Sequence, residues 1–239
     1  ITDKTASEGI ARFGLERKLD RWKRPAEIFR RLKQKTRERD QLVGERTLVK
    51  NQMHAEQTEA YPSKESIARM KTRIKLLNKQ VMEIKEELSA LVKQDEAVKG
   101  SIALISSIPG VGVLTAVTVL AETNGFELIR NKRQLTSYAG LDVKEKLSGT
   151  SVKGKPRISK KGNRHLRKAM YMPALSVIRC EGRFKTLFVR LVSRHGIKMK
   201  AAVAVQRKLL EMIYTVYKTN TAFDKDYLKD ELIALSTQR

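Results

Sequence analysis

Apolar residues recur at alternating spacings of three and four between residues 67 and 98. The series comprises Ile67, Met70, Ile74, Leu77, Val81, Ile84, Leu88, Leu91 and Val98, with Asp95 as the single polar interruption. A repeat sustained over about four heptads predicts a coiled-coil seam rather than the broader apolar face of a globular helix. Ser63 is suited to cap the start of this helix, and Glu65 lies favourably in its first turn.

The segment before Pro62 keeps a weaker form of the same register. Its apolar positions are Ile28, Leu32, Leu42, Val49 and Met53, and its basic interruptions are Lys35, Arg39 and Arg46. A turn at Pro62 would fold the two helices into an antiparallel coiled-coil hairpin. The basic side chains have two interpretations: they extend past the seam into solvent, or they contact nucleic acid or a helix of another subunit.

Residues 101–121 carry no charge and could be mistaken for a membrane span. Pro109, Gly110 and Gly112 interrupt the run and leave two segments that are each too short to cross a bilayer. Helices are predicted over residues 113–121, 126–138, 161–178 (with a kink at Pro173) and 198–219, and a β-hairpin or ordered loop over residues 140–158. The predicted fold class is mainly α.

The charge balance points to a polyanionic partner. The 239 residues include 50 Lys and Arg against 26 Asp and Glu, a formal net charge of +24, and cations gain affinity by displacing counterions from phosphates. This excess argues against a metabolite enzyme with an ordinary surface. A hydrophobic content of 41% is enough for a core, whereas 5% aromatic residues are too few for a base-stacking surface. The single cysteine, Cys180, excludes a disulfide framework and fits a reducing, cytoplasmic compartment.

The turn Ile108-Pro109-Gly110-Val111-Gly112, between two apolar helices, has the pattern of a helix-hairpin-helix motif. Glycines allow the backbone to approach a phosphate, and the first amides of the next helix can point toward it. Gly110, Val111 and Gly112 are therefore candidate contacts to a nucleic-acid backbone. The alternative is a tight turn between two core helices.

Residues 130–168 contain 13 Lys and Arg but only two acids, Asp142 and Glu145. Such concentration predicts a backbone-binding surface, with Lys161, Arg164 and Lys168 at helical spacing along one stripe. The alternative is a surface that only confers solubility. The candidate nucleic-acid contacts are Lys153, Lys155, Arg157, Lys160, Lys161, Asn163, Arg164, Arg167 and Lys168.

Ser148 precedes Gly149 beside this basic segment and is a candidate nucleophile for a phosphodiester. Nearby cations would stabilise charge on the phosphate oxygens, while the hydroxyl would need activation by a base or a metal. On these residues alone a simple turn is the stronger interpretation.

Four stretches together resemble the insertion-sequence transposase family that includes the Piv-type DNA invertases, described as bridge-RNA-guided serine recombinases. They are residues 108–112, Tyr138-Ala139-Gly140-Leu141, Ser148-Gly149, and Ile158-Ser159-Lys160-Lys161-Gly162-Asn163 followed by Leu166-Arg167. The resemblance implies that Ser148 forms a covalent phosphoserine link to DNA during strand exchange.

The family also has an N-terminal RuvC-like nuclease domain, in which four acids bind a divalent metal such as Mg²⁺. Residues 2–7 resemble the run that carries the last two acids: Asp3 matches the third, but Ala6 stands at the fourth. The first two would precede Ile1. One carboxylate cannot hold Mg²⁺ alone, so we expect an incomplete metal site and a fragment that is inactive by itself.

These inferences predict four parts: a RuvC-like remnant (1–24), a coiled-coil hairpin (25–99), a helix-hairpin-helix-containing transposase domain (100–220) and a tail (221–239). The expected function is that of a bacterial, nucleoid-associated DNA transposase or recombinase. Its expected partners are DNA, a structured guide RNA and further copies of the chain, bound through the coiled coil. The alternative is a non-catalytic helix-hairpin-helix protein that binds DNA or RNA.

Overall fold

The computed structural model describes residues 2–18, 24–148, 152–180 and 182–224. Within them the chain is predominantly helical and has one two-stranded sheet, so the predicted mainly α class is confirmed. The elements are α1 (Asp3–Glu16), α2 (Glu27–Gln57), α3 (Lys64–Lys93), α4 (Glu96–Ser106), α5 (Val113–Thr123), α6 (Lys132–Tyr138), β1 (Val143–Ser148), β2 (Val152–Ile158), α7 (Arg164–Arg179), α8 (Arg183–His195) and α9 (Lys198–Thr219).

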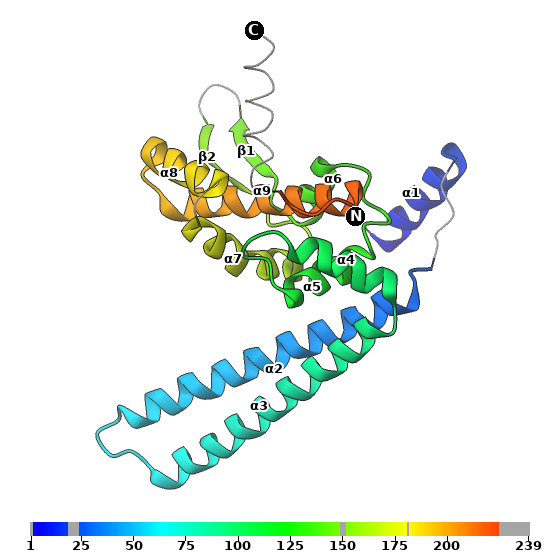
Figure 1. Cartoon of the computed structure of the whole chain (residues 1–239). Helices are drawn as coiled ribbons and strands as arrows, with labels where there is room; N and C mark the ends of the chain where they lie inside the picture. The colour runs from blue at the N-terminus through cyan, green and yellow to red at the C-terminus, as the bar shows by residue number, and fades with distance from the viewer. Residues whose placement is uncertain (1, 19–23, 149–151, 181, 225–239) are drawn as a thin grey trace.

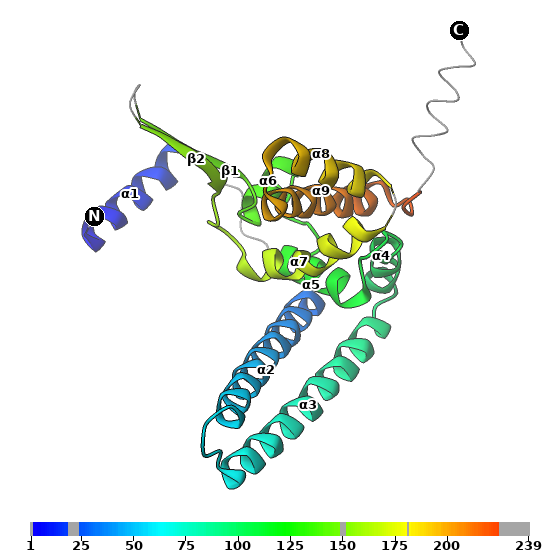
Figure 2. The same cartoon turned by 90° about the vertical axis from the view of Figure 1, so that its left-hand side faces the viewer.

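Helices α2 and α3 form an antiparallel hairpin that projects away from the remaining helices (Figure 1, Figure 2). Ser63 caps α3, because its side chain accepts a hydrogen bond from the Ser66 amide at 3.1 Å. The predicted seam is buried between the two helices, at Leu32 and Val49 of α2 and at Leu77, Val81, Ile84, Leu88 and Leu91 of α3. The predicted helical hairpin is therefore confirmed.

The apolar repeat does not run through a single helix as far as Val98. Helix α3 ends at Lys93, and the Asp95 side chain accepts a hydrogen bond from the Val98 amide at 3.0 Å, which starts α4. The polar interruption in the pattern is thus an N-cap. Val98 packs into the core of the helical body, α4–α9.

The helical body is built around α9. This helix contacts α4, α6, α7 and α8 and buries Val205, Leu209, Leu210 and Ile213. Its bounds agree with the predicted helix over residues 198–219. Helix α5 is also enclosed, since it packs against α2, α4 and α7. The base of the hairpin shares this core through Leu32 and Leu88.

The segment between α6 and α7 folds as the predicted β-hairpin, with β1 and β2 antiparallel. The helix predicted over residues 126–138 begins only at Lys132, because Asn131 caps it and the backbone at Phe126 is left-handed. Pro173 lies inside α7, as predicted. Helices α1 and α8 were not predicted. No helix in the described part of the chain is long and apolar enough to cross a membrane.

Candidate nucleic-acid interface

Glu122 is the buried centre of the contact between the hairpin and the helical body. It follows the uncharged apolar run at the end of α5, and its side chain is fully shielded from solvent. Arg37 of α2 donates from Nε and Nη2 to the two carboxylate oxygens, at 2.8 and 2.9 Å. Lys33 Nζ lies 3.7 Å from Oε2. The two helices are thereby joined by a two-point ion pair.

Asn163 connects the same carboxylate to α7. Its Nδ2 donates to Glu122 Oε2 at 2.7 Å, while its Oδ1 accepts from the His165 and Leu166 amides at 3.0 Å and caps the helix. Burial raises the pKa of Glu122, but the hydrogen bonds from Arg37 and Asn163 outweigh that effect and hold the pKa below its ordinary value. Glu122 is therefore ionised at neutral pH.

Two of the sequence motifs, residues 138–141 and 158–163, are joined by backbone hydrogen bonds at the start of α7. The Asn163 amide donates to Tyr138 O at 2.7 Å, and the Lys160 amide donates to Gly140 O at 3.1 Å. A Cβ at Gly162 would lie 2.4 Å from Tyr138 O, and the φ of Gly162 is +133°. Only glycine therefore fits at this position. These backbone contacts fix the position of Lys160 and Lys161, the basic residues that follow β2.

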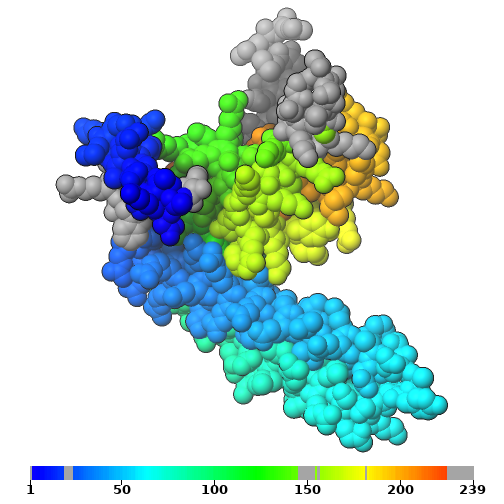
Figure 3. Space-filling view, turned by 180° about the vertical axis from the view of Figure 1, so that it is seen from behind, coloured from blue at the N-terminus to red at the C-terminus, as the bar shows by residue number. Residues whose placement is uncertain are grey.

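A groove of about 900 Å³ runs between α2 and the first turns of α7. In the space-filling view, the yellow-green residues near 160 lie directly against the blue start of the hairpin (Figure 3). The groove is lined by Gln34, Arg37, Glu38, Asp40, Gln41 and Gly44 of α2 and by Arg164, His165 and Lys168 of α7. Because Glu122 binds partners on both helices, it sets the position of both walls.

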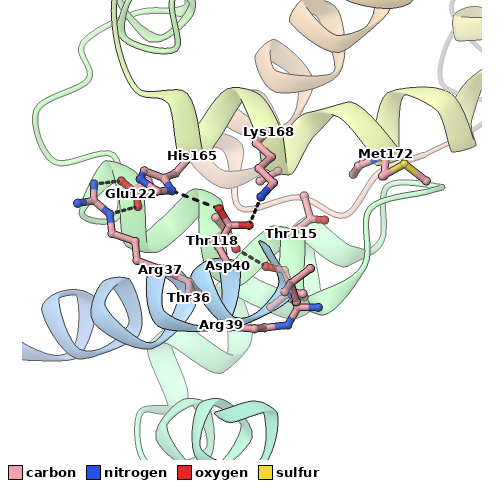
Figure 4. A pocket seen from close by; sticks show the side chains of 14 residues that line it. Thr36, Arg37, Arg39, Asp40, Thr115, Thr118, Glu122, His165, Lys168 and Met172 are labelled. Carbon is pink, nitrogen blue, oxygen red and sulfur yellow. Dashed lines mark hydrogen bonds and ion pairs between the residues drawn. The ribbon is translucent and has the colours of Figure 1, made fainter. Parts of the chain in front are cut away.

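Asp40 bridges the two walls further along the groove. Lys168 Nζ donates to Asp40 Oδ1 at 2.5 Å, and His165 Nδ1 lies 3.7 Å from Oδ2 (Figure 4). Lys168 remains well exposed despite this pair. The carboxylate is thus neutralised by a lysine that the sequence marked as a nucleic-acid contact.

The predicted contacts fall into two groups. Arg157, Lys160, Lys161 and Arg164 are exposed around the start of α7 and can meet a ligand. Asn163 and Arg167 instead serve the fold: Asn163 caps α7, and Arg167 Nη1 donates to Ala139 O at 2.7 Å. Both residues therefore have a structural role, whereas none of the four exposed cations is paired with a carboxylate of the described chain.

The turn at residues 108–112 has a structural explanation for one of its two glycines. A Cβ at Gly110 would lie 2.8 Å from Val177 Cγ1 of α7, and φ is +79°. Val111 is buried. Gly112, in contrast, has open space around it and begins α5, which no side chain caps. The backbone amides at the start of α5, beside Gly112, are therefore the part of the turn that could bind an anion.

The remaining predicted residues lie at the edge of the described structure. Ser148 ends β1 opposite Val152; its side chain, and those of Lys153 and Lys155, are outside the described part. Asp3 is exposed at the start of α1. The described residues include no cluster of three His, Cys, Asp or Glu that could hold a metal ion.

Residues 102–189, which span α4 to α8, match the model of the transposase family IS116/IS110/IS902. Over 231 residues the chain is 28% identical to a pilin gene-inverting protein of Moraxella bovis, covering 94% of this chain and 68% of that protein. The chain is therefore similar to IS110-type transposases and DNA invertases. Over 149 residues the chain is 32% identical to the transposase for insertion sequence element IS1111A of Coxiella burnetii, covering 59% of the chain and 39% of that protein.

Sequence reasoning missed the residues that hold the two walls of the groove together. Glu122 is the first charge after the uncharged run 101–121, and that isolation was the one available signal. Nothing local connects it with Arg37, since 85 residues separate the two.

Proposed function

We propose that the chain binds DNA as the transposase part of a DNA-recombination enzyme, with the DNA backbone along the groove between α2 and α7. The observation that carries this proposal is the exposure of Arg164, which lines the groove, and of Lys160 and Lys161, which precede α7 in the sequence. No carboxylate of the described chain is paired to these three cations. Cations on a fixed turn bind phosphates without reading bases, so this surface positions DNA rather than selecting its sequence.

The names of the relatives support strand exchange as the reaction class. One is a pilin gene-inverting protein and another a transposase, and both gene inversion and transposition require phosphodiester bonds to be broken and rejoined. A structured guide RNA would be a second polyanion for the same basic surface. We also propose that copies of the chain associate through the hairpin.

Ser148 is the proposed nucleophile, on the strength of the family resemblance of residues 108–167. Its Oγ would attack the scissile phosphorus, forming a serine–phosphate ester as the bond to the departing deoxyribose oxygen breaks; that oxygen would take up a proton. The backbone register pairs Ser148 with Val152 and the preceding Leu147 with Lys153, which keeps the serine close to a basic strand.

Mg²⁺ does not fit the described residues. The only matching acid, Asp3, is exposed and is followed by Ala6 one helical turn later, and a hard cation needs several oxygen ligands.

Salt dependence tests the binding proposal. The affinity of the chain for a labelled duplex should fall steeply with salt concentration, with a slope of log Kd against log salt equal to about 0.9 per neutralised phosphate. A slope near zero, or an affinity no higher than that of a neutral protein, would contradict backbone binding. An RNA hairpin measured in parallel compares the two polyanions.

Covalent trapping tests the nucleophile. The complete protein should form an adduct with a nicked target duplex, and Ser148→Ala should abolish the adduct while DNA affinity stays within about twofold. Ser137→Ala, at an exposed serine of α6, is the matched control and should keep the adduct. An adduct that persists in Ser148→Ala would show that another residue is the nucleophile. DNA binding without any adduct would favour the non-catalytic alternative.

A further inference from the structure

Three basic residues interrupt the apolar register of α2, and two of them have polar partners on α3 while the third does not. Lys35 Nζ lies 2.6 Å from Glu87 Oε2 of α3, and Arg46 Nη1 donates to Asn78 Oδ1 of α3 at 2.9 Å. Arg39 differs: its Nε is buried and has no hydrogen-bond partner among the described residues. Burial lowers the pKa of Arg39.

Arg39 lines a pocket of about 260 Å³ between α2, α5 and α7 (Figure 4). Leu114, Met172 and Pro173 form an apolar wall, and Thr115 and Thr118 add hydroxyl groups. The first turn of α5, which no side chain caps, thus contributes to the wall. A helix N-terminus favours a negatively charged ligand nearby.

Among the described residues no carboxylate forms a close ion pair with Arg39, although the charge of neighbouring Asp40 partly offsets the effect of burial on its pKa. Of the two carboxylates in the lining, Glu122 is bound by Arg37 and Asp40 by Lys168. One guanidinium therefore remains without an ion-pair partner. A buried donor without an acceptor costs free energy, and a guanidinium matches the planar, two-oxygen geometry of a phosphate.

We propose that this pocket binds a phosphate group through Arg39, and that in the working protein a nucleic-acid strand in the groove supplies it. The pocket shares Arg37, Asp40, His165 and Lys168 with the groove, so a strand lying there can reach it. The second clause rests on the proposed function; the phosphate site itself does not.

Thermal unfolding with inorganic phosphate tests the site without nucleic acid. In a zwitterionic buffer of matched ionic strength, phosphate should raise the Tm of the native chain above that in chloride, because a ligand that binds only the folded state stabilises it. Arg39→Met should lose this shift, whereas Arg46→Met removes the same charge from the same helix and should keep it. An equal shift in Arg39→Met would overturn the site.

Two further measurements distinguish a phosphate site from a structural role of Arg39 and from a carboxylate site. In chloride, Arg39→Met should melt no lower than the native chain, because it removes an unpartnered buried donor; a marked fall in Tm would show a structural role instead. Acetate replaces phosphate to represent a carboxylate from a partner protein. If acetate raises the Tm as much as phosphate does, the occupant is a carboxylate and the proposal is wrong.

Nucleic-acid affinity tests the source of the phosphate. Arg39→Met should weaken binding of a single-stranded oligonucleotide by about tenfold, the loss expected for one charge-assisted contact, and Arg46→Met should stay within about twofold. Equal losses of affinity in both variants would show that the strand does not enter the pocket. If the native chain binds no nucleic acid at all, the proposed function fails, and the phosphate-dependent Tm still decides the site.

Discussion

Arg37 and Glu122 form a two-point ion pair across 85 residues of sequence, with donor–acceptor distances of 2.8 and 2.9 Å. The same carboxylate accepts a hydrogen bond from Asn163, the N-cap of α7. One buried acid therefore fixes both α2 and α7, the two walls of the groove. The position of the basic residues at the start of α7 relative to the hairpin depends on this contact.

Replacing Glu122 should destabilise the fold. Glu122→Gln removes one partner of a buried ion pair and leaves Arg37 without its counterion, at an expected cost of about 2–3 kcal/mol; this is below the range for fully enclosed pairs because Arg37 is partly exposed. Glu127→Gln, at an exposed position of the following turn, should cost under about 0.5 kcal/mol. Chemical denaturation measures both. Equal stabilities would contradict the role given to Glu122.

The same acid should give the fold a recognisable pH dependence. The pKa of Glu122 in the folded chain lies below its ordinary value of 4.5, so its stabilisation is present above pH 4.5 and is lost as the pH falls toward the lower folded value. The free energy of unfolding of the native chain should therefore fall in this window more steeply than that of Glu122→Gln. Parallel curves for the two proteins would refute the assignment.

Gly162 should be among the least replaceable residues of the chain. Gly162→Ala meets both a positive φ and a backbone oxygen 2.4 Å from the new Cβ, whereas Gly182→Ala has a similar φ of +131° and open space. Backbone strain alone should cost about 1–3 kcal/mol at Gly182. The loss at Gly162 should exceed it by at least about 2 kcal/mol. Thermal unfolding compares the stabilities of the two variants. Similar losses of stability would show that the backbone at Tyr138 leaves room for a Cβ at residue 162.

The hairpin seam offers a test with adjacent leucines. Leu77 is 8% exposed and Leu76 is 55% exposed on the same helix. Leu77→Asp places a charge against α2 and should destabilise the hairpin by at least about 3 kcal/mol, whereas Leu76→Asp should change little. Circular dichroism during denaturation follows the helices. If both substitutions have the same effect, the seam has been assigned to the wrong face.

Much of the fold was predictable because it depends on local periodicity. The repeat in residues 67–91 identified α3, and the apolar face of α9 fixed that helix as residues 198–219. Helix α8 escaped prediction because it lies between Gly182 and Gly196, is rich in arginine and buries only Phe184. Packing against α9, rather than its own pattern, gives it a place in the body.

The interface was predictable only in part. Lys160, Lys161 and Arg164 were recognisable from charge density, because exposed cations need no tertiary partner to be seen. Asn163 and Arg167 looked equivalent in the sequence, yet the fold uses one as a cap and the other as a donor to Ala139. Such long-range contacts leave no periodic trace, so the sequence could not distinguish these two residues from the exposed cations.

The most direct test of the account measures DNA affinity after single charges are removed inside and outside the groove. Arg164→Gln at the groove should weaken duplex binding severalfold and lower the salt slope by about 0.9, the loss of one phosphate contact. Lys71→Gln, an exposed cation on the outer half of α3, should change neither quantity measurably. An unchanged slope in Arg164→Gln, or an equal loss in Lys71→Gln, would contradict DNA binding along the groove.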